Sequence, residues 1–102
     1  MKNETQILNL LGLARKANRV SFGHDAAKAA LRGGKARLCL LCTDASPRLA
    51  EEMTFLAAQA NIALQSTGFT AQDIKTATQY KAAVLTINER GFAQKIKALT
   101  EQ

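Results

Sequence analysis

Two cysteines and one histidine are the residues of this chain whose types suggest reactive or metal-binding chemistry. Cys39 and Cys42 have the C-x-x-C spacing of redox and zinc sites, and His24 is the only histidine. A structural zinc needs about four ligands, and a redox pair needs a helix N-terminus that stabilises its thiolate. Residues 38–42 are instead a continuous apolar run typical of a buried strand, on which positions three apart face opposite sides. We therefore expect two buried, unreactive thiols and no metal site.

The lone histidine gives little support for catalysis. Asp25 follows it directly, but adjacent side chains on a helix do not face each other, so no carboxylate relay is evident. An enzyme using Cys39 or Cys42 with His24 is the least favoured of three hypotheses for this chain. We predict a non-catalytic protein without a cofactor, in which His24 makes a surface polar contact at the start of a helix.

Residues 22–37 combine glycines with basic residues in a pattern that favours phosphate binding. Gly23 precedes an alanine-rich segment that predicts a rigid helix over residues 24–32, and Gly33-Gly34 predict its left-handed C-terminal cap. The N-terminus of such a helix has free N–H groups and a positive dipole end, and a glycine allows close approach. The spacing does not match a nucleotide-binding P-loop. Contacts to a phosphate backbone are predicted for the flanking cations Lys28, Arg32 and Lys35, with Arg15, Lys16 and Arg19 nearby in the sequence.

The net charge of +6 is concentrated in the first third of the chain. Residues 1–37 contain eight Lys and Arg against two acidic residues, whereas residues 38–102 contain six of each sign. This asymmetry indicates a polyanionic partner, nucleic acid first and an acidic membrane second. The alternative is a charged surface that only keeps a small protein soluble.

Helices and strands must alternate to position these residues. Ser46 is the predicted N-cap of a helix that stops at a left-handed Asn61, and Asn88 is the predicted N-cap of the last helix. The alternation predicts an α/β protein, a three-layer α/β/α sandwich around a small four-stranded mixed sheet, as a single domain spanning residues 1–102. Helices are expected at 5–17, 24–32, 47–60, from 70 and after 88, and strands at 19–22, 38–42, 62–65 and 82–87.

Composition excludes several classes of protein. The chain is 47% hydrophobic and 22% charged, which is ordinary for a globular protein and argues against disorder. No apolar run approaches the roughly 20 residues of a membrane span, and the first residues lack the order of a signal peptide. We predict a cytoplasmic monomer.

Four segments resemble a known family: Leu10–Ala17 (LLGLARKA), Gly23–Lys35 (GHDAAKAALRGGK), Thr43–Ser46 (TDAS) and Asn88–Ala93 (NERGFA). In this order, and covering nearly the whole chain, they resemble the L7Ae/L30e superfamily of kink-turn RNA-binding ribosomal proteins, and within it the small bacterial YlxQ-like members. The resemblance implies the α/β/α sandwich. It also implies binding to a sharply bent RNA with sheared G·A pairs, which is recognised by its shape and unpaired bases.

The resemblance further implies where RNA would bind. In the family, the N-terminal end of the second helix enters the RNA groove and a loop after the third strand touches an extruded base. Here Asp25 would accept a hydrogen bond from a guanine amino group, and Phe69 would stack on a base. The full set of expected RNA-binding residues is Gly23, His24, Asp25, Lys28, Arg32, Lys35, Arg15, Lys16, Arg37, Gly68, Phe69 and Lys75.

Two hypotheses follow. The leading one is a non-catalytic protein that binds structured RNA, kink-turn-like or ribosomal, in association with the ribosome or another ribonucleoprotein. The second is a protein-interaction module that kept the fold but lost kink-turn recognition. It is motivated by Asp25, Ala26 and Ala29, which stand where the RNA binders of the family carry other residues.

Overall fold

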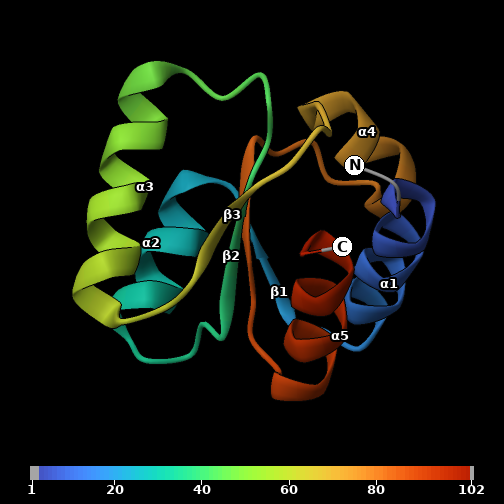
Figure 1. Cartoon of the computed structure of the whole chain (residues 1–102), viewed down its shortest axis with the longest axis horizontal. Helices are drawn as coiled ribbons and strands as arrows, with labels where there is room; N and C mark the ends of the chain where they lie inside the picture. The colour runs from blue at the N-terminus through green and yellow to red at the C-terminus, as the bar shows by residue number, and fades with distance from the viewer. Residues whose placement is uncertain (1–2, 102) are drawn as a thin grey trace.

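A four-stranded mixed sheet lies at the centre of the fold, with helices on both of its faces (Figure 1). The structure, a computed structural model, describes residues 3–101. The strand order is β1-β4-β2-β3, so the short strand β1 lies at one edge. The strands are β1 (Val20–Phe22), β2 (Leu38–Leu41), β3 (Leu64–Ser66) and β4 (Val84–Ile87). The helices are α1 (Glu4–Lys16), α2 (His24–Arg32), α3 (Pro47–Ala60), α4 (Ala71–Thr78) and α5 (Arg90–Thr100).

Strand β4 pairs with two strands and so determines which segments meet at each end of the sheet. It runs antiparallel to both of its neighbours, β1 and β2, while β2 and β3 are parallel. Ile87 at the end of β4 therefore lies opposite both Val20 and Leu38, the first residues of β1 and β2. At the other end of the sheet, Val84 lies opposite Leu41. Segments that precede β1 and β2 consequently meet at one end, and segments that follow them meet at the other.

The helices form an outer layer on each face, which confirms the three-layer sandwich. Helices α2 and α3 cover one face, and α1, α4 and α5 cover the other (Figure 1). Alternate residues of β2 serve opposite layers, because Cβ direction alternates along a strand. Leu38 and Leu40 pack with α1, α4 and α5, whereas Cys39 and Leu41 pack with α2 and α3. Burying each large apolar side chain contributes about 1.5–3 kcal/mol.

The two cysteines diverge as predicted. Cys39 is buried in the α2–α3 layer and Cys42 in the layer on the opposite face, and both thiols are free. Burial raises the pKa of each thiol to about 12. The Cys42 Sγ–H donates to the Ala82 carbonyl at 3.5 Å. Both sulfurs are therefore protonated at neutral pH.

Most predicted helix ends are confirmed. Ser46 accepts a hydrogen bond from the Leu49 N–H at 3.1 Å with Pro47 at the first helical position. Asn61 stops α3 in the left-handed region at φ 58°. At the end of α2 the left-handed residue is Gly34, at φ 76°. Each of these ends depends on local chemistry that is legible in the sequence.

The predicted cap of the last helix is wrong. Glu89, and not Asn88, caps α5, because its carboxylate accepts the N–H groups of Gly91 and Phe92, each at 2.8 Å. Those two bonds lower the pKa of Glu89. Asn88 still belongs to the end of the sheet, where its N–H donates to the Arg19 carbonyl at 2.7 Å. The helix therefore begins one residue later than predicted.

The third strand also starts later than expected, at Leu64, because the Ile62 N–H is used to close α3 by donating to the Ala57 carbonyl. None of the helices within residues 3–101 has the length and apolar composition of a membrane span. In the same range, no three His, Cys, Asp or Glu side chains gather as a metal-binding group would.

Candidate nucleic-acid interface

The N-terminal end of α2 has the backbone geometry of an anion site. Gly23 adopts φ 91° and ψ 171°, a conformation that is open to glycine and strained for other residues. Its N–H donates to the Val84 carbonyl at 2.9 Å, which ties the start of α2 to the start of β4. A glycine supplies no side chain to cap the helix, and no atom lies within 4 Å of where its Cβ would be. The first amides of α2 thus have no side-chain cap, and the space beside Gly23 is open.

His24 lies between two carboxylates. Its Nδ1 is 2.9 Å from Asp25 Oδ1, and its Nε2 is 2.9 Å from Glu52 Oε1 on α3. The hydrogen bond to Glu52, and then the one to Asp25, raise the pKa of His24. The expectation that Asp25 does not face His24 is wrong, because the two side chains are within hydrogen-bond distance at the first residue of the helix. With both ring nitrogens engaged, His24 is a bridge between α2 and α3.

Glu52 also reduces the positive charge of this end. The Lys28 Nζ lies 3.6 Å from Glu52 Oε2, so the predicted phosphate contact is paired with an acid. Its hydrogen bond with His24, and then Lys28, lower the pKa of Glu52. The side chain of Asp25 is fully exposed. His24 and Lys28 therefore both stand beside acids.

An exposed aromatic stack lies beside the first turn of α2. The rings of Phe22 and Tyr80 stack with centroids 4.9 Å apart at an interplanar angle of 14°. The Arg15 guanidinium carbon lies 5.3 Å from the Tyr80 ring centroid. Tyr80 is 49% exposed. These residues and Ala26 of α2 line a groove of about 420 Å³.

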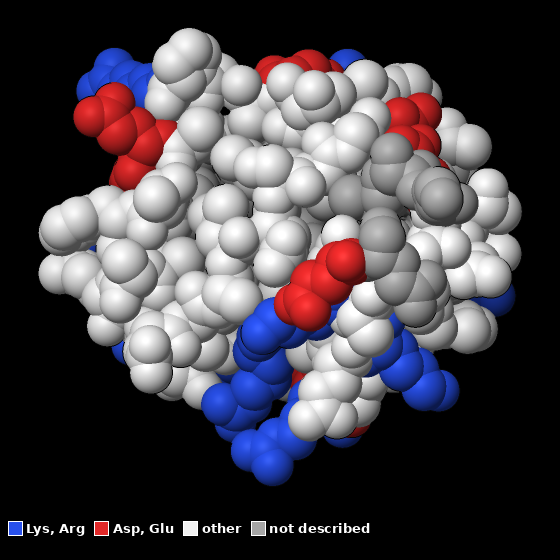
Figure 2. Space-filling model, in the orientation of Figure 1, with Lys and Arg blue, Asp and Glu red and all other residues white. Residues whose placement is uncertain are grey.

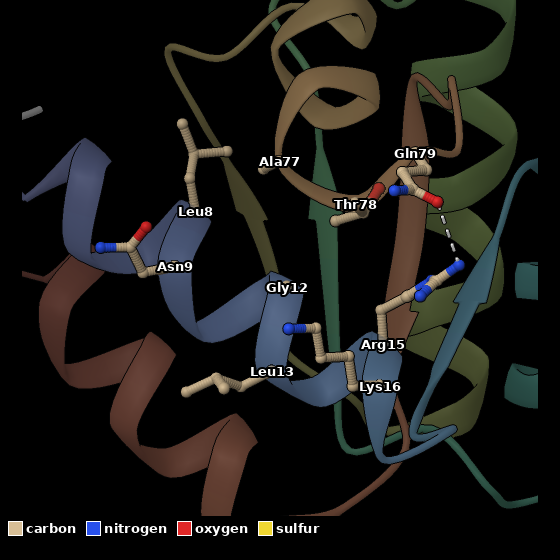
Figure 3. Close-up of a pocket in the computed structure, with 9 residues that line it drawn as sticks. All are labelled: Leu8, Asn9, Gly12, Leu13, Arg15, Lys16, Ala77, Thr78 and Gln79. Carbon is tan, nitrogen blue, oxygen red and sulfur yellow. Dashed lines mark hydrogen bonds between the residues drawn. The ribbon is translucent and has the colours of Figure 1, made fainter.

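Arg15 and Lys16 also line a second groove, between α1 and α4 (Figure 3). The Arg15 Nη2 donates to Gln79 Oε1 at 3.4 Å, which directs the guanidinium toward the end of α4. The two helices approach closely at Gly12, where a Cβ would lie 3.1 Å from the Ala77 carbonyl oxygen. Packing of α1 on α4 therefore places Arg15 next to Tyr80.

The predicted contacts of the loop after β3 are only partly available. Phe69 is fully buried in the α1–α4–α5 layer, so the prediction that it stacks on a base is wrong. The Phe69 ring anchors this loop in the core. The backbone holds the loop as well, because the Phe69 carbonyl accepts the Thr43 N–H at 2.7 Å. A Cβ at Gly68 would lie 2.7 Å from the Glu4 carboxylate, so this part of the loop faces an acid. Lys75 is exposed on α4, one turn before Gln79.

The remaining predicted cations lie at the opposite end of the sheet. Arg32 is the last residue of α2, and Lys35 and Arg37 follow it, about 13 Å of helix away from Gly23. The Arg37 N–H donates to the Ile87 carbonyl at 2.7 Å, which fixes this segment at the end of β4. Figure 2 shows Lys and Arg side chains gathered at the lower end of the molecule, around the start of α5. The structure thus divides the predicted site into two groups.

The fold is that of a small α/β/α sandwich protein with basic surfaces. Comparison with known proteins gives its family. The chain belongs to the Ribosomal protein L7Ae/L30e/S12e/Gadd45 family, whose model matches residues 5–97. A search of curated proteins finds no match.

Two solved structures share the fold. A protein of unknown function from Bacillus halodurans C is 25% identical, with a TM-score of 0.88 over 94% of this chain and 97% of that one. A 15.5kD RNA-binding protein from Giardia lamblia is 17% identical, with a TM-score of 0.82 over 99% of this chain and 89% of that one. The similarity to the Bacillus protein agrees with the resemblance to small bacterial members of the family.

Proposed function

We propose that this is a non-catalytic RNA-binding protein that contacts structured RNA, kink-turn-like or ribosomal, through the N-terminal end of α2. Membership of the family and the fold shared with an RNA-binding protein support this proposal. The observation that carries it is the exposed stack of Phe22, Tyr80 and Arg15 beside the first turn of α2. The protein would act as a cytoplasmic monomer that joins a ribosomal or other ribonucleoprotein particle.

The groove beside this stack suits an unpaired nucleotide. A base that enters it extends the stack of Tyr80 and Arg15, and stacking contributes about 1–3 kcal/mol per base. The phosphates on either side approach the uncapped amides of the first turn of α2 and the Lys16 ammonium. Stacking supplies contact to bases at an end of the molecule where Glu52 offsets the charge of Lys28.

The buried thiols support a non-catalytic function. Cys39 and Cys42 lie in different layers with pKa values raised to about 12, so neither supplies a thiolate nucleophile at neutral pH. Both nitrogens of His24 are engaged by carboxylates. If either thiol of the folded protein reacts rapidly with an alkylating reagent, this part of the proposal fails.

Tyr80 provides a direct test, because it is the only tyrosine and the chain has no tryptophan. Its intrinsic fluorescence should be quenched when a kink-turn RNA is added, after correction for absorption by the RNA. Tyr80→Ala should weaken binding about tenfold, the lower part of the range for one stacked base. The matched control is Phe55→Ala, which removes another exposed aromatic, 61% exposed on α3, and should leave the affinity unchanged. Equal affinities for Tyr80→Ala and the unmodified chain would refute the stacking contact.

Kink-turn specificity needs a separate comparison. The second RNA is of the same length and carries Watson–Crick pairs in place of the sheared G·A pairs, so that only the bend is lost. We expect tighter binding to the bent RNA at every salt concentration. Identical affinities and identical salt dependence for the two RNAs would leave backbone binding and exclude kink-turn recognition.

A protein-interaction module is the second candidate function. The fully exposed Asp25 and the pairing of Lys28 with Glu52 favour it, because both reduce the attraction of the α2 end for a polyanion. Capture of the tagged protein after nuclease treatment distinguishes the two functions. A stable protein partner without bound RNA would favour the module, whereas loss of the partners with the RNA would favour RNA binding.

A further inference from the structure

The end of the sheet opposite Gly23 gathers cations from three separate segments. Arg19 immediately precedes β1 and Arg37 immediately precedes β2, and both strands pair with β4. The Arg19 carbonyl accepts the Asn88 N–H, and the Arg37 N–H donates to the Ile87 carbonyl, each at 2.7 Å. The register of the sheet thus holds these two residues beside the end of β4. We name this surface the basic end, consisting of Arg19, Lys35, Arg37, Arg90 and Lys97.

The basic end carries unneutralised charge. All five side chains are exposed, and none forms an ion pair within residues 3–101. Glu89 is close enough for Arg19 to lower its pKa, but its carboxylate is committed to the N–H groups that it caps on α5. Glu101 follows Lys97 by one turn of α5 without pairing with it. This surface therefore differs from the α2 N-terminal end, where Glu52 pairs with both His24 and Lys28.

Two grooves meet at Arg37. The larger, of about 530 Å³, is lined by Arg19, Lys35 and Arg37, and the smaller, of about 200 Å³, adds Arg90 and Lys97. The positive charge therefore lines hollows, in which a phosphate can meet several cations at once.

Uncharged donors are held in the larger groove. The Thr86 hydroxyl donates to Asn88 Oδ1 at 2.9 Å, and Asn88 Nδ2 donates to Ser21 Oγ at 2.8 Å. These two hydrogen bonds fix the orientation of the Asn88 amide, and they leave the Ser21 hydroxyl proton to donate to a ligand. Preorganised hydroxyl and amide donors beside arginines are the partners that phosphate oxygens take in nucleic-acid complexes.

The larger groove joins the groove beside Tyr80. Both are lined by Asn18, Val20 and Ser21, which lie along the outer side of β1. Strand β1 pairs only with β4, so its outer side is not covered by another strand. A continuous path therefore runs from the stack of Tyr80 and Arg15 along β1 to the basic end.

We propose that RNA bound at the N-terminal end of α2 continues along the outer side of β1 and places its phosphates on the basic end. For the class of ligand this inference rests on the proposed function, and it adds a second contact surface that lies away from the helix N-terminus. The α2 end recognises the structured part of the RNA, and the basic end binds a single-stranded flank through its backbone, without regard to its sequence.

The test compares a kink-turn RNA with the same RNA extended by about four single-stranded nucleotides at either end, a length within the range of known single-strand sites. Extension at one of the two ends should raise the affinity for RNA about tenfold at roughly 0.1 M salt. A gain of this size corresponds to one or two phosphate contacts. Lys35→Gln/Arg37→Gln should abolish that gain, and it should lower the salt slope for the extended RNA by about 1.4, which is two contacts on a single strand. Binding of the unextended RNA should not change.

Arg48→Gln/Lys95→Gln is the matched control. It also removes two exposed cations, one on α3 and one on α5, neither of which lines either groove, and it should keep the full gain from the extension. Equal loss in the two double variants would show a nonspecific charge effect and overturn the proposal.

The remaining outcomes separate the two proposals. If the unextended RNA binds through Tyr80 but neither extension adds affinity, the path along β1 is wrong while the proposed function stands. If the unmodified protein binds neither RNA, both proposals fail. If Lys35→Gln/Arg37→Gln abolishes binding to phosphatidylserine vesicles and leaves both RNAs bound as before, the basic end serves a membrane surface and the RNA path is refuted.

Discussion

The two ends of the sheet use different physical means to attract the same kind of ligand. The N-terminal end of α2 has a glycine with positive φ, uncapped amides and an exposed aromatic stack, but His24 and Lys28 there are paired with Asp25 and Glu52. Within residues 3–101, the basic end has five exposed cations without ion pairs and no aromatic ring in its grooves. The first end is shaped for contact with a nucleotide, and the second for attraction to a backbone.

This difference shows that charge along a sequence does not locate a site. Lys28, Arg32 and Lys35 lie within one basic stretch, yet the sheet and the length of α2 send them to different ends of the molecule. The positive charges of residues 1–37 therefore belong to two separate surfaces, although they are neighbours in the sequence. Which surface binds more tightly depends on the acids that other segments bring to each.

The largest expected effect is on stability, and it distinguishes Phe69 from Tyr80, the two aromatic residues considered for base stacking. Phe69→Ala should lower the free energy of unfolding by about 3–5 kcal/mol, because it leaves a cavity in the α1–α4–α5 layer. Tyr80→Ala should cost less than about 1 kcal/mol, since the ring is half exposed. Urea denaturation measures both. A small loss for Phe69→Ala would mean that its ring is not held in the core.

The next effect compares the glycines at the two ends of α2. Gly23→Ala should destabilise the fold by about 2 kcal/mol, because its φ and ψ lie in a region nearly exclusive to glycine. Gly34→Ala should cost about 1 kcal/mol, the ordinary penalty of a left-handed alanine. Thermal unfolding followed by circular dichroism gives the ranking. If Gly34→Ala were the more damaging substitution, the conformation of Gly23 would not be what holds the α2 end.

Removal of one acid should make the two ends more alike. Glu52→Gln releases Lys28 from its ion pair, and at low salt we expect about threefold tighter binding of structured RNA, the scale of a single exposed charge. Glu51→Gln is the control, because it removes an exposed neighbouring acid on α3 that forms no ion pair within residues 3–101. Anisotropy titrations of labelled RNA would detect the difference. Weaker binding by Glu52→Gln would mean that the His24–Glu52 bridge itself shapes the site.

The smallest effect is a pH dependence at the α2 end. Glu52 and Asp25 raise the pKa of His24 above 6.5, so its contribution to stability is fully present below about pH 6.5 and is lost as the pH rises through the folded-state pKa. A proton NMR titration of the only histidine measures this pKa directly. The pKa should fall toward 6.5 in Glu52→Gln and stay raised in Glu51→Gln. An unchanged pKa in Glu52→Gln would assign the shift to Asp25 alone.

Much of the fold was predictable because its signals are local. Ser46 and Pro47 start α3 and Asn61 ends it as their positions indicate, since caps act within a few residues of the chain. Divergence of Cys39 and Cys42 follows from the alternation of side chains on any strand. Asn88 shows where this fails, because a residue suited to cap a helix was instead needed to pair with Arg19 across the sheet end.

The site was less predictable because its contacts are long-range. Tyr80 stacks on Phe22, 58 positions earlier, and nothing in either segment specifies the other. One signal was available in the sequence: Tyr80 is a single tyrosine in a short polar loop, and its hydroxyl favours exposure. Tyr80 is 49% exposed, whereas Phe69 is fully buried. The bridge between His24 and Glu52 spans 28 residues and needs the packing of α2 on α3.

The amino-acid sequence by itself determined the alternating elements, the buried thiols, the glycine at the start of α2 and the excess of positive charge. These depend on side-chain type, periodicity and neighbours within a few residues. Only the tertiary structure decided how that charge is divided, which cation is neutralised and which aromatic ring is exposed. The physical reason is the antiparallel pairing of β4 with both β1 and β2, which brings Arg19, Arg37 and Asn88 together at one end and leaves Gly23 at the other.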